Sequence, residues 1–150
     1  MSGPWVGARG FCAVVLLALA ACAGAGMAGA GDAAETLAGT AWQLEELNGR
    51  AAVPATGGAV PTLSFAAGEA RASGNGGCNQ FSGPYTQQGA SLRFGPLAST
   101  RRACVDEAGN AQETAYLRAL ESVTRHTATA ELLTLYAGDQ PVARLTRSAE

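Results

Sequence analysis

The four cysteines are the residues of this chain best suited to covalent chemistry. Cys22 follows Leu19-Ala20-Ala21, an aliphatic residue and two small residues of the kind that precede the modified cysteine of bacterial lipoproteins. Small side chains give a peptidase access to the bond, and the cysteine sulfur takes a diacylglycerol. We therefore predict lipidation at Cys22. The alternative is a plain signal peptide that is cleaved after Ala20-Ala21 or at a later small residue.

The residues before Cys22 have the features of a leader. Arg9 is the single charge in residues 1–21, and residues 11–21 form an uncharged apolar run. A membrane-spanning helix needs about 20 such residues, whereas a signal peptide needs a shorter run. We predict that residues 1–21 are a signal peptide. Residues 22–36, rich in alanine and glycine, are predicted to be a flexible tether.

Cys78 and Cys104 would remain after Cys12 leaves with the leader and Cys22 is acylated. Two leftover cysteines in an exported protein are candidates for a disulfide. Closing a loop of about 27 residues would stabilise the fold by ~3.5 kcal/mol. Two buried free thiols are the alternative. A metal site is not expected, because structural zinc usually takes four ligands and His126 is the single histidine.

Asn79 and Gln80 are candidate binding residues because they lie in the glycine-rich segment 74–85. Asn79 could contact a ligand. Alternatively, its side chain could hydrogen-bond the local backbone, or the residue could adopt a left-handed conformation, as asparagine often does.

Arg101 and Arg102 are candidate anion-binding residues, because two guanidinium groups can hold a carboxylate or phosphate by forked hydrogen bonds. Alternatively, both could be solvated, or could form weak surface pairs with Asp106 and Glu107.

Alternating apolar and polar residues predict several short strands. In residues 41–47, Trp42 and Leu44 alternate with polar neighbours, and Trp42 is expected in the core. The same pattern, interrupted by turn-forming residues, predicts further strands at about 61–65, 69–74, 81–85, 91–94, 132–136 and 142–145.

One helix is predicted, over residues 111–123, with Asn110 as its N-cap and Glu113 completing a capping box. Its apolar stripe consists of Tyr116, Leu117, Leu120 and Val123. Short strands with one helix predict an α+β fold, in which a mostly antiparallel, barrel-like β-sheet packs against one α-helix.

The sequence offers little for catalysis. A Ser-His-Asp triad would have to use His126, which is expected to cap the end of the helix or face solvent, and the Gly-x-Ser-x-Gly motif of many hydrolases is absent. Adjacent Glu45 and Glu46 would point to opposite faces of a strand. We expect no enzymatic activity, no metal and no cofactor. The net charge of −2 gives no reason to expect nucleic-acid binding.

Three segments together resemble the META domain family, also called HslJ-like. They are residues 77–85 (Gly-Cys-Asn-Gln-Phe-Ser-Gly-Pro-Tyr), residues 94–101 (Phe-Gly-Pro-Leu-Ala-Ser-Thr-Arg) and Ala103-Cys104. The resemblance covers about residues 37–146, and we place the domain at 37–147. The family often has methionine where this chain has Arg102. A buried guanidinium needs a partner, so we expect Arg102 either to point outward or to pair with a carboxylate.

The resemblance implies a β-rich domain with one packed helix, exported or lipid-anchored, in a family associated with heat-shock and envelope-stress responses and novobiocin tolerance. We expect a monomer anchored by lipid in the bacterial envelope, facing the periplasm from the outer membrane, that binds another envelope protein. The alternative is a carrier that holds a small molecule inside a barrel.

Overall fold

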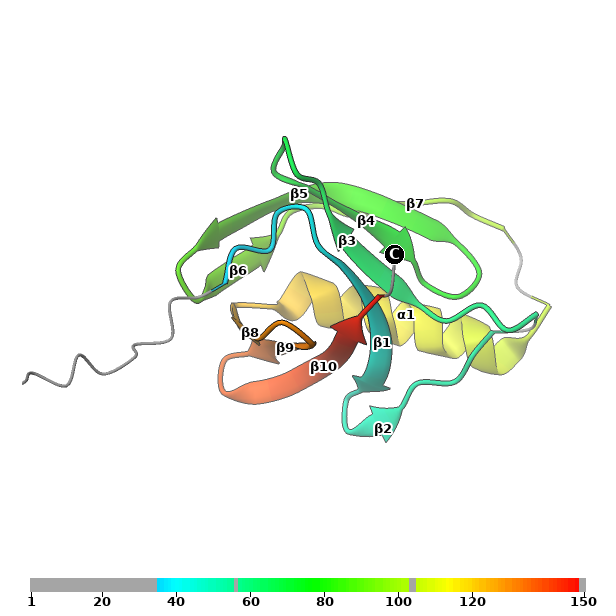
Figure 1. The fold of residues 1–150 in the computed structure, drawn as a ribbon. Coiled ribbons are helices and arrows are strands. Elements are labelled where there is room, and N and C mark those ends of the chain that lie inside the picture. Colours follow the sequence, from blue (N-terminus) through cyan, green and yellow to red (C-terminus); the bar gives the residue numbers. More distant parts are fainter. Residues whose placement is uncertain (1–34, 56, 103–104, 149–150) are drawn as a thin grey trace, which may run out of the picture.

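The first and last strands pair with one another and so close an antiparallel barrel (Figure 1). The computed structural model describes residues 35–55, 57–102 and 105–148. The elements in chain order are β1 (Ala41–Leu47), β2 (Arg50–Ala51), β3 (Thr62–Phe65), β4 (Arg71–Asn75), β5 (Gln80–Gln88), β6 (Ser91–Phe94), β7 (Ala98–Ser99), α1 (Glu107–Ser122), β8 (Arg125–Ala128), β9 (Leu132–Ala137) and β10 (Gln140–Arg147).

The barrel follows the order β10-β9-β8-β6-β5-β4-β3-β1, and the pairing of β1 with β10 completes the ring. Two short strands lie beside it: β2 pairs with β1, and β7 pairs with β5. The longest strand, β5, pairs with β4 along one edge, while its other edge is shared by β6 and β7. The predicted α+β fold, a barrel-like antiparallel sheet with one packed helix, is confirmed.

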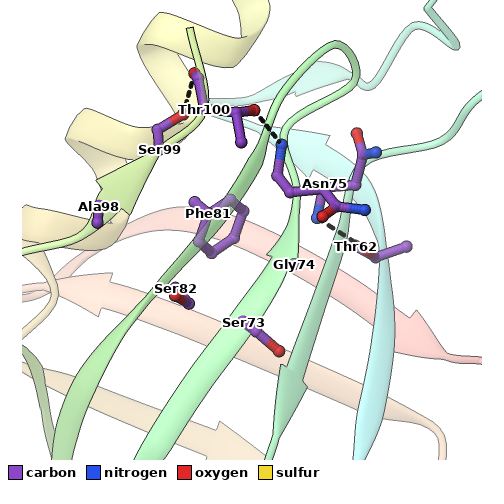
Figure 2. A pocket seen from close by; sticks show the side chains of 10 residues that line it. Thr62, Ser73, Gly74, Asn75, Phe81, Ser82, Ala98, Ser99 and Thr100 are labelled. Atoms are coloured by element: carbon purple, nitrogen blue, oxygen red, sulfur yellow. Dashed lines mark hydrogen bonds between the residues drawn. The ribbon is translucent and has the colours of Figure 1, made fainter.

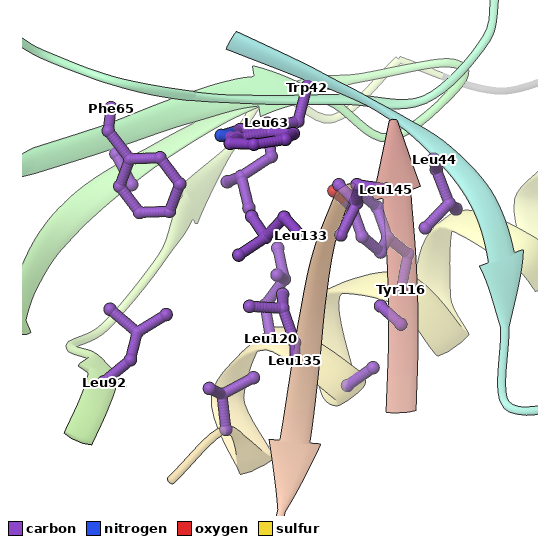
Figure 3. Packing of buried hydrophobic residues seen from close by; sticks show 14 of the residues in the cluster. Trp42, Leu44, Leu63, Phe65, Leu92, Tyr116, Leu120, Leu133, Leu135 and Leu145 are labelled. Atoms are coloured by element: carbon purple, nitrogen blue, oxygen red, sulfur yellow. The ribbon is translucent and has the colours of Figure 1, made fainter. Parts of the chain in front are cut away.

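The barrel interior is filled by large apolar side chains, as the alternation in the sequence predicts (Figure 3). Trp42 is 1% exposed, which confirms its predicted place in the core. The helix α1 packs against β1, β6, β9 and β10. Its side chains join residues of seven strands in the core. The largest buried apolar side chains include Trp42, Leu63, Leu92, Tyr116, Leu120, Leu133, Leu135 and Leu145.

Tyr116 connects the helix to β3. Its hydroxyl donates a hydrogen bond to the carbonyl oxygen of Thr62 at 3.4 Å. Burial raises the pKa of the Tyr116 phenol, so the ring stays neutral and packs as part of the core.

The helix begins earlier than predicted, at Glu107 instead of residue 111. The prediction of Asn110 as N-cap is wrong, because Asp106 has extended backbone angles and its side chain accepts a hydrogen bond from the Ala108 amide at 3.0 Å. Asn110 lies inside the helix. The capping-box prediction for Glu113 therefore fails as well, and this carboxylate makes different contacts, described below.

His126 was predicted to cap the helix or to face solvent, and both alternatives are wrong. It lies in β8, a strand that the sequence pattern did not predict, and its side chain is 0% exposed. Its neighbours Arg125 and Thr127 are more accessible, so β8 has the alternation of a half-buried strand.

In the described part of the chain, we find no helix with the length and hydrophobicity to cross a bilayer.

Candidate functional site

The side chain of Asn79 joins the start of β5 to the segment that follows β7. Its Oδ1 accepts hydrogen bonds from the Thr100 hydroxyl at 2.9 Å and from the Arg102 amide at 2.7 Å. Its Nδ2 donates to the Arg102 carbonyl oxygen at 3.3 Å and to Glu113 Oε1 at 2.7 Å. An amide side chain has two acceptor and two donor positions. All four are used within the protein, which favours the structural interpretation of Asn79.

Glu113 is a carboxylate of α1 that is only 6% exposed. Its Oε2 accepts the backbone amides of Cys78 at 3.0 Å and Asn79 at 2.6 Å, and its Oε1 accepts from the Asn79 side chain. A buried carboxylate is tolerated when hydrogen bonds replace its water. Glu113 thus attaches the glycine-rich loop to the helix. We name Glu113, Asn79 and their hydrogen-bond partners the Asn79–Glu113 network.

The sequence did not lead us to predict that Glu113 holds the glycine-rich loop, although the residue pattern of the helix contained an indication. Glu113, Tyr116 and Leu120 follow one another at helical spacing, so a charged residue lies in line with the buried stripe of the helix. Such a residue needs partners in the core. The sequence alone could not show that the partners are backbone amides of a loop more than thirty residues away.

Two glycines allow the loop to approach the carboxylate so closely. A Cβ atom added at Gly76 would lie 2.5 Å from Glu113 Cγ, closer than atoms tolerate. Gly77 has a φ of +118°, a conformation that L-residues rarely adopt. The glycines of the loop therefore allow its backbone to pack closely against Glu113 of α1.

An open polar groove of about 630 Å³ lies on the outer face of the barrel beside this network (Figure 2). It is lined mainly by hydroxyl and amide side chains and crosses β3, β4, β5 and β7. The lining residues are Thr62, Ser73, Gly74, Asn75, Gln80, Phe81, Ser82, Ala98, Ser99 and Thr100. An adjoining pocket of about 120 Å³ shares Asn75, Gln80 and Thr100 with the groove and extends it to Cys78 and Arg102.

The groove is suited to binding through hydrogen bonds. Gln80 and Ser73 are exposed on its floor, and their side chains make no hydrogen bond within the described part of the chain. Thr100 is held by hydrogen bonds to Asn79 and to the Gln80 backbone. The lining contains no histidine, aspartate or glutamate. The groove therefore has donors and acceptors for a ligand but no acid–base pair for proton transfer.

Arg101 and Arg102 are both exposed. Among the described residues, neither guanidinium forms an ion pair, so the predicted surface pairs with Asp106 and Glu107 are not observed. Of the two expectations for Arg102, the outward-pointing one is confirmed. Its backbone is bonded to Asn79 while its side chain lines the smaller pocket. Of the four candidate binding residues, Gln80 and Arg102 line the groove or its extension, Asn79 supports it from beneath, and Arg101 lies beside Arg102.

Cys78 is disulfide-bonded in the structure. Its sulfur lies 3.8 Å from the carbonyl oxygen of Arg102, which precedes Cys104 by two positions. Cys104 lies outside the described residues, as do Cys22, the leader and most of the predicted tether, so the Cys78–Cys104 pairing stays a prediction. Among the described residues, no three or more histidine, cysteine, aspartate or glutamate side chains converge as metal ligands would.

The fold and site define a class: a small closed barrel with one helix, in which a glycine-rich loop is fixed to the helix by a buried carboxylate. The model of the META domain family matches residues 35–150, and the chain therefore belongs to this family. It is similar to a protein from Burkholderia xenovorans solved by NMR, with 33% identity and a TM-score of 0.64, covering 76% of this chain and 85% of that one.

A second protein solved by NMR has 27% identity and a TM-score of 0.57, covering 72% of this chain and 89% of that one. No functionally curated protein is significantly similar to the chain.

Proposed function

We propose that the chain is a lipid-anchored protein of the bacterial envelope whose META domain is a non-catalytic binding domain, and that it contributes to tolerance of envelope or heat stress and of antibiotics. In this proposal, the polar groove binds another envelope protein. One observation supports it most directly. The side chains of Asn79 and Glu113 bond to groups within the protein, and these bonds hold Gln80, Thr100 and Arg102 along an open groove.

The packed interior favours surface binding over the alternative, a carrier with a ligand inside the barrel. Trp42, Leu63, Leu133, Leu135 and Leu145 are each at most 1% exposed and fill the space between the strands. The concavities described above lie on the outside of the barrel. A carrier would need room within it for at least part of its ligand.

The groove also has properties of a protein contact. Hydroxyl and amide groups on β4 and β5 can donate to and accept from a partner's backbone or side chains. At the far end from Arg102, Arg71 donates a hydrogen bond to Ser82 at 2.9 Å and so orders that part of the floor. An ordered surface loses less conformational entropy when it binds.

The lipid anchor is tested by Cys22→Ser. The variant lacks the sulfur that would take the diacylglycerol, so we expect the protein to move from the membrane fraction to the soluble fraction. The measurement is immunoblotting of fractionated cells. The matched control is Cys12→Ser, which removes a cysteine of the predicted leader and should leave the protein in membranes. Retention of Cys22→Ser in the membrane fraction would refute the lipidation site.

The binding site is tested by placing a photo-crosslinking amino acid at Ser73, on the groove floor, or at Thr127, an exposed strand residue of β8. We expect the Ser73 position to crosslink in living cells to one envelope protein that the Thr127 position does not capture. Adding Arg102→Gln should lower that yield several-fold. If both positions gave the same products, or Ser73 gave none, the groove would not be the contact surface.

A further inference from the structure

Two backbone groups of a short N-terminal segment are hydrogen-bonded to one side chain of the barrel. We name residues 35–37 the N-terminal strap. Gln87, near the end of β5, accepts a hydrogen bond from the Leu37 amide at 3.1 Å through Oε1, and its Nε2 donates to the Glu35 carbonyl oxygen at 3.0 Å. The Leu37 side chain is 0% exposed. The two backbone groups of the strap fix the orientation of the Gln87 amide.

The fixed amide determines the protonation state of His126. Gln87 Nε2 lies 3.3 Å from His126 Nε2. Since that nitrogen of Gln87 is a donor, the facing nitrogen of His126 must be an acceptor and carry no proton. The proton of the neutral ring is therefore on Nδ1. This atom is buried and forms no hydrogen bond in the described part of the chain.

We propose that His126, Gln87 and the N-terminal strap form a latch that opens on acidification. A protonated imidazole ring carries N–H on both nitrogens, so its Nε2–H would face the NH₂ group of Gln87, donor against donor. Rotation of the Gln87 amide by half a turn would place its oxygen opposite this N–H and remove the conflict. Its NH₂ would then face the Leu37 amide, and its oxygen would face the Glu35 carbonyl. Both bonds to the strap are lost in that orientation.

The surroundings of His126 keep it neutral when the strap is closed. Burial lowers the pKa of His126, and the backbone carbonyls of Glu35 and Ala90 partly oppose that shift. The neighbouring elements bring few charges. Glu35 of the strap and Arg93 of β6 are exposed, Arg125 of β8 contacts Tyr136 of β9, and β5 contains no charged residue.

The direction of the pH effect follows from linkage. The closed state has a His126 pKa below the ordinary value of 6.5, while a solvated histidine in the open state titrates near about 6.5. The closed strap therefore has its full stability above about pH 6.5 and loses it as the pH falls toward the closed-state pKa. In that window, the opening equilibrium constant should rise by up to about tenfold per pH unit.

The test uses the full chain in detergent micelles. Hydrogen–deuterium exchange, corrected for the intrinsic pH dependence, would follow peptides covering residues 35–40 between pH 7.5 and 5.0. NMR would titrate His126, whose ring signals are unambiguous because the chain has one histidine. We expect protection of the Leu37 amide to fall as His126 takes up its proton, while a core strand such as β9 stays protected.

Two variants separate the latch from general acid sensitivity. His126→Gln keeps an acceptor toward Gln87 but does not titrate, so its strap should stay protected at pH 5.0. Gln87→Ala should leave the strap unprotected at every pH, and Gln88→Ala, an exposed neighbour, should behave as the unmodified chain. If His126→Gln lost protection at low pH as the unmodified chain does, or if His126 titrated without any change at Leu37, the latch would be refuted.

Discussion

Replacing Glu113 with alanine should lower the free energy of unfolding by about 4 kcal/mol. The change leaves the amides of Cys78 and Asn79 and the Asn79 side chain without their acceptor. Each buried donor left unsatisfied costs about 1–3 kcal/mol. For a domain of this size, the melting temperature should fall by more than about 10 °C. Thermal and urea unfolding, followed by circular dichroism, would measure both quantities.

Glu121→Ala is the matched control, because Glu121 is an exposed glutamate of the same helix and its loss should cost less than about 1 kcal/mol. Asn79→Ala should be nearly as damaging as Glu113→Ala. Because the two residues share hydrogen bonds, the double variant should be less destabilised than the sum of the single variants. A small effect of Glu113→Ala, or strict additivity, would show that the loop does not depend on the carboxylate.

Reduction of the predicted Cys78–Cys104 bond should lower stability by ~3.5 kcal/mol, since the unfolded chain regains the freedom of a loop of about 27 residues. The melting temperature should then fall by well over about 5 °C. Cys78 Sγ lies close to the carbonyl oxygen of Arg102, and Arg102 is two residues before Cys104 in the sequence. The measurement is a pair of melting curves with and without reductant, on protein whose thiols are counted by alkylation.

The control for reduction is the double variant Cys78→Ala and Cys104→Ala, whose melting curve should be low and insensitive to reductant. An unmodified chain that melted at the same temperature under both conditions would contradict the bridge. Alkylation of both thiols before reduction would do the same.

The sequence predicted most of the longer strands and the helix well, because each of these elements depends on a local pattern. Alternating residues in β1 and β3 place Trp42, Leu44, Leu63 and Phe65 on one face. β8 was missed because it has four residues and its buried position is a histidine. A polar residue in a short strand removes the apolar alternation on which strand prediction relies.

The site was predicted less completely, because it depends on contacts between distant segments. Gln80 and Arg102 were proposed from their residue types and do line concave surface. The role of Glu113 was misjudged, because a local capping motif explained its position three residues after Asn110. Gln87 drew no attention, since an isolated glutamine in a strand gives no signal until the strap and His126 are seen beside it.

The pairing of β1 with β10 also constrains how the domain can form in time. Trp42 and Arg147 are opposite one another in the closing register, about a hundred positions apart in the chain, and loop-closure entropy must be overcome before such contacts stabilise anything. Domains dominated by non-local strand pairing fold in milliseconds to seconds. A nascent chain lacking its last strand cannot complete the ring. The closed barrel therefore forms only after β10 has been made, a property that suits a polypeptide which, as proposed, must be threaded through a membrane before it folds.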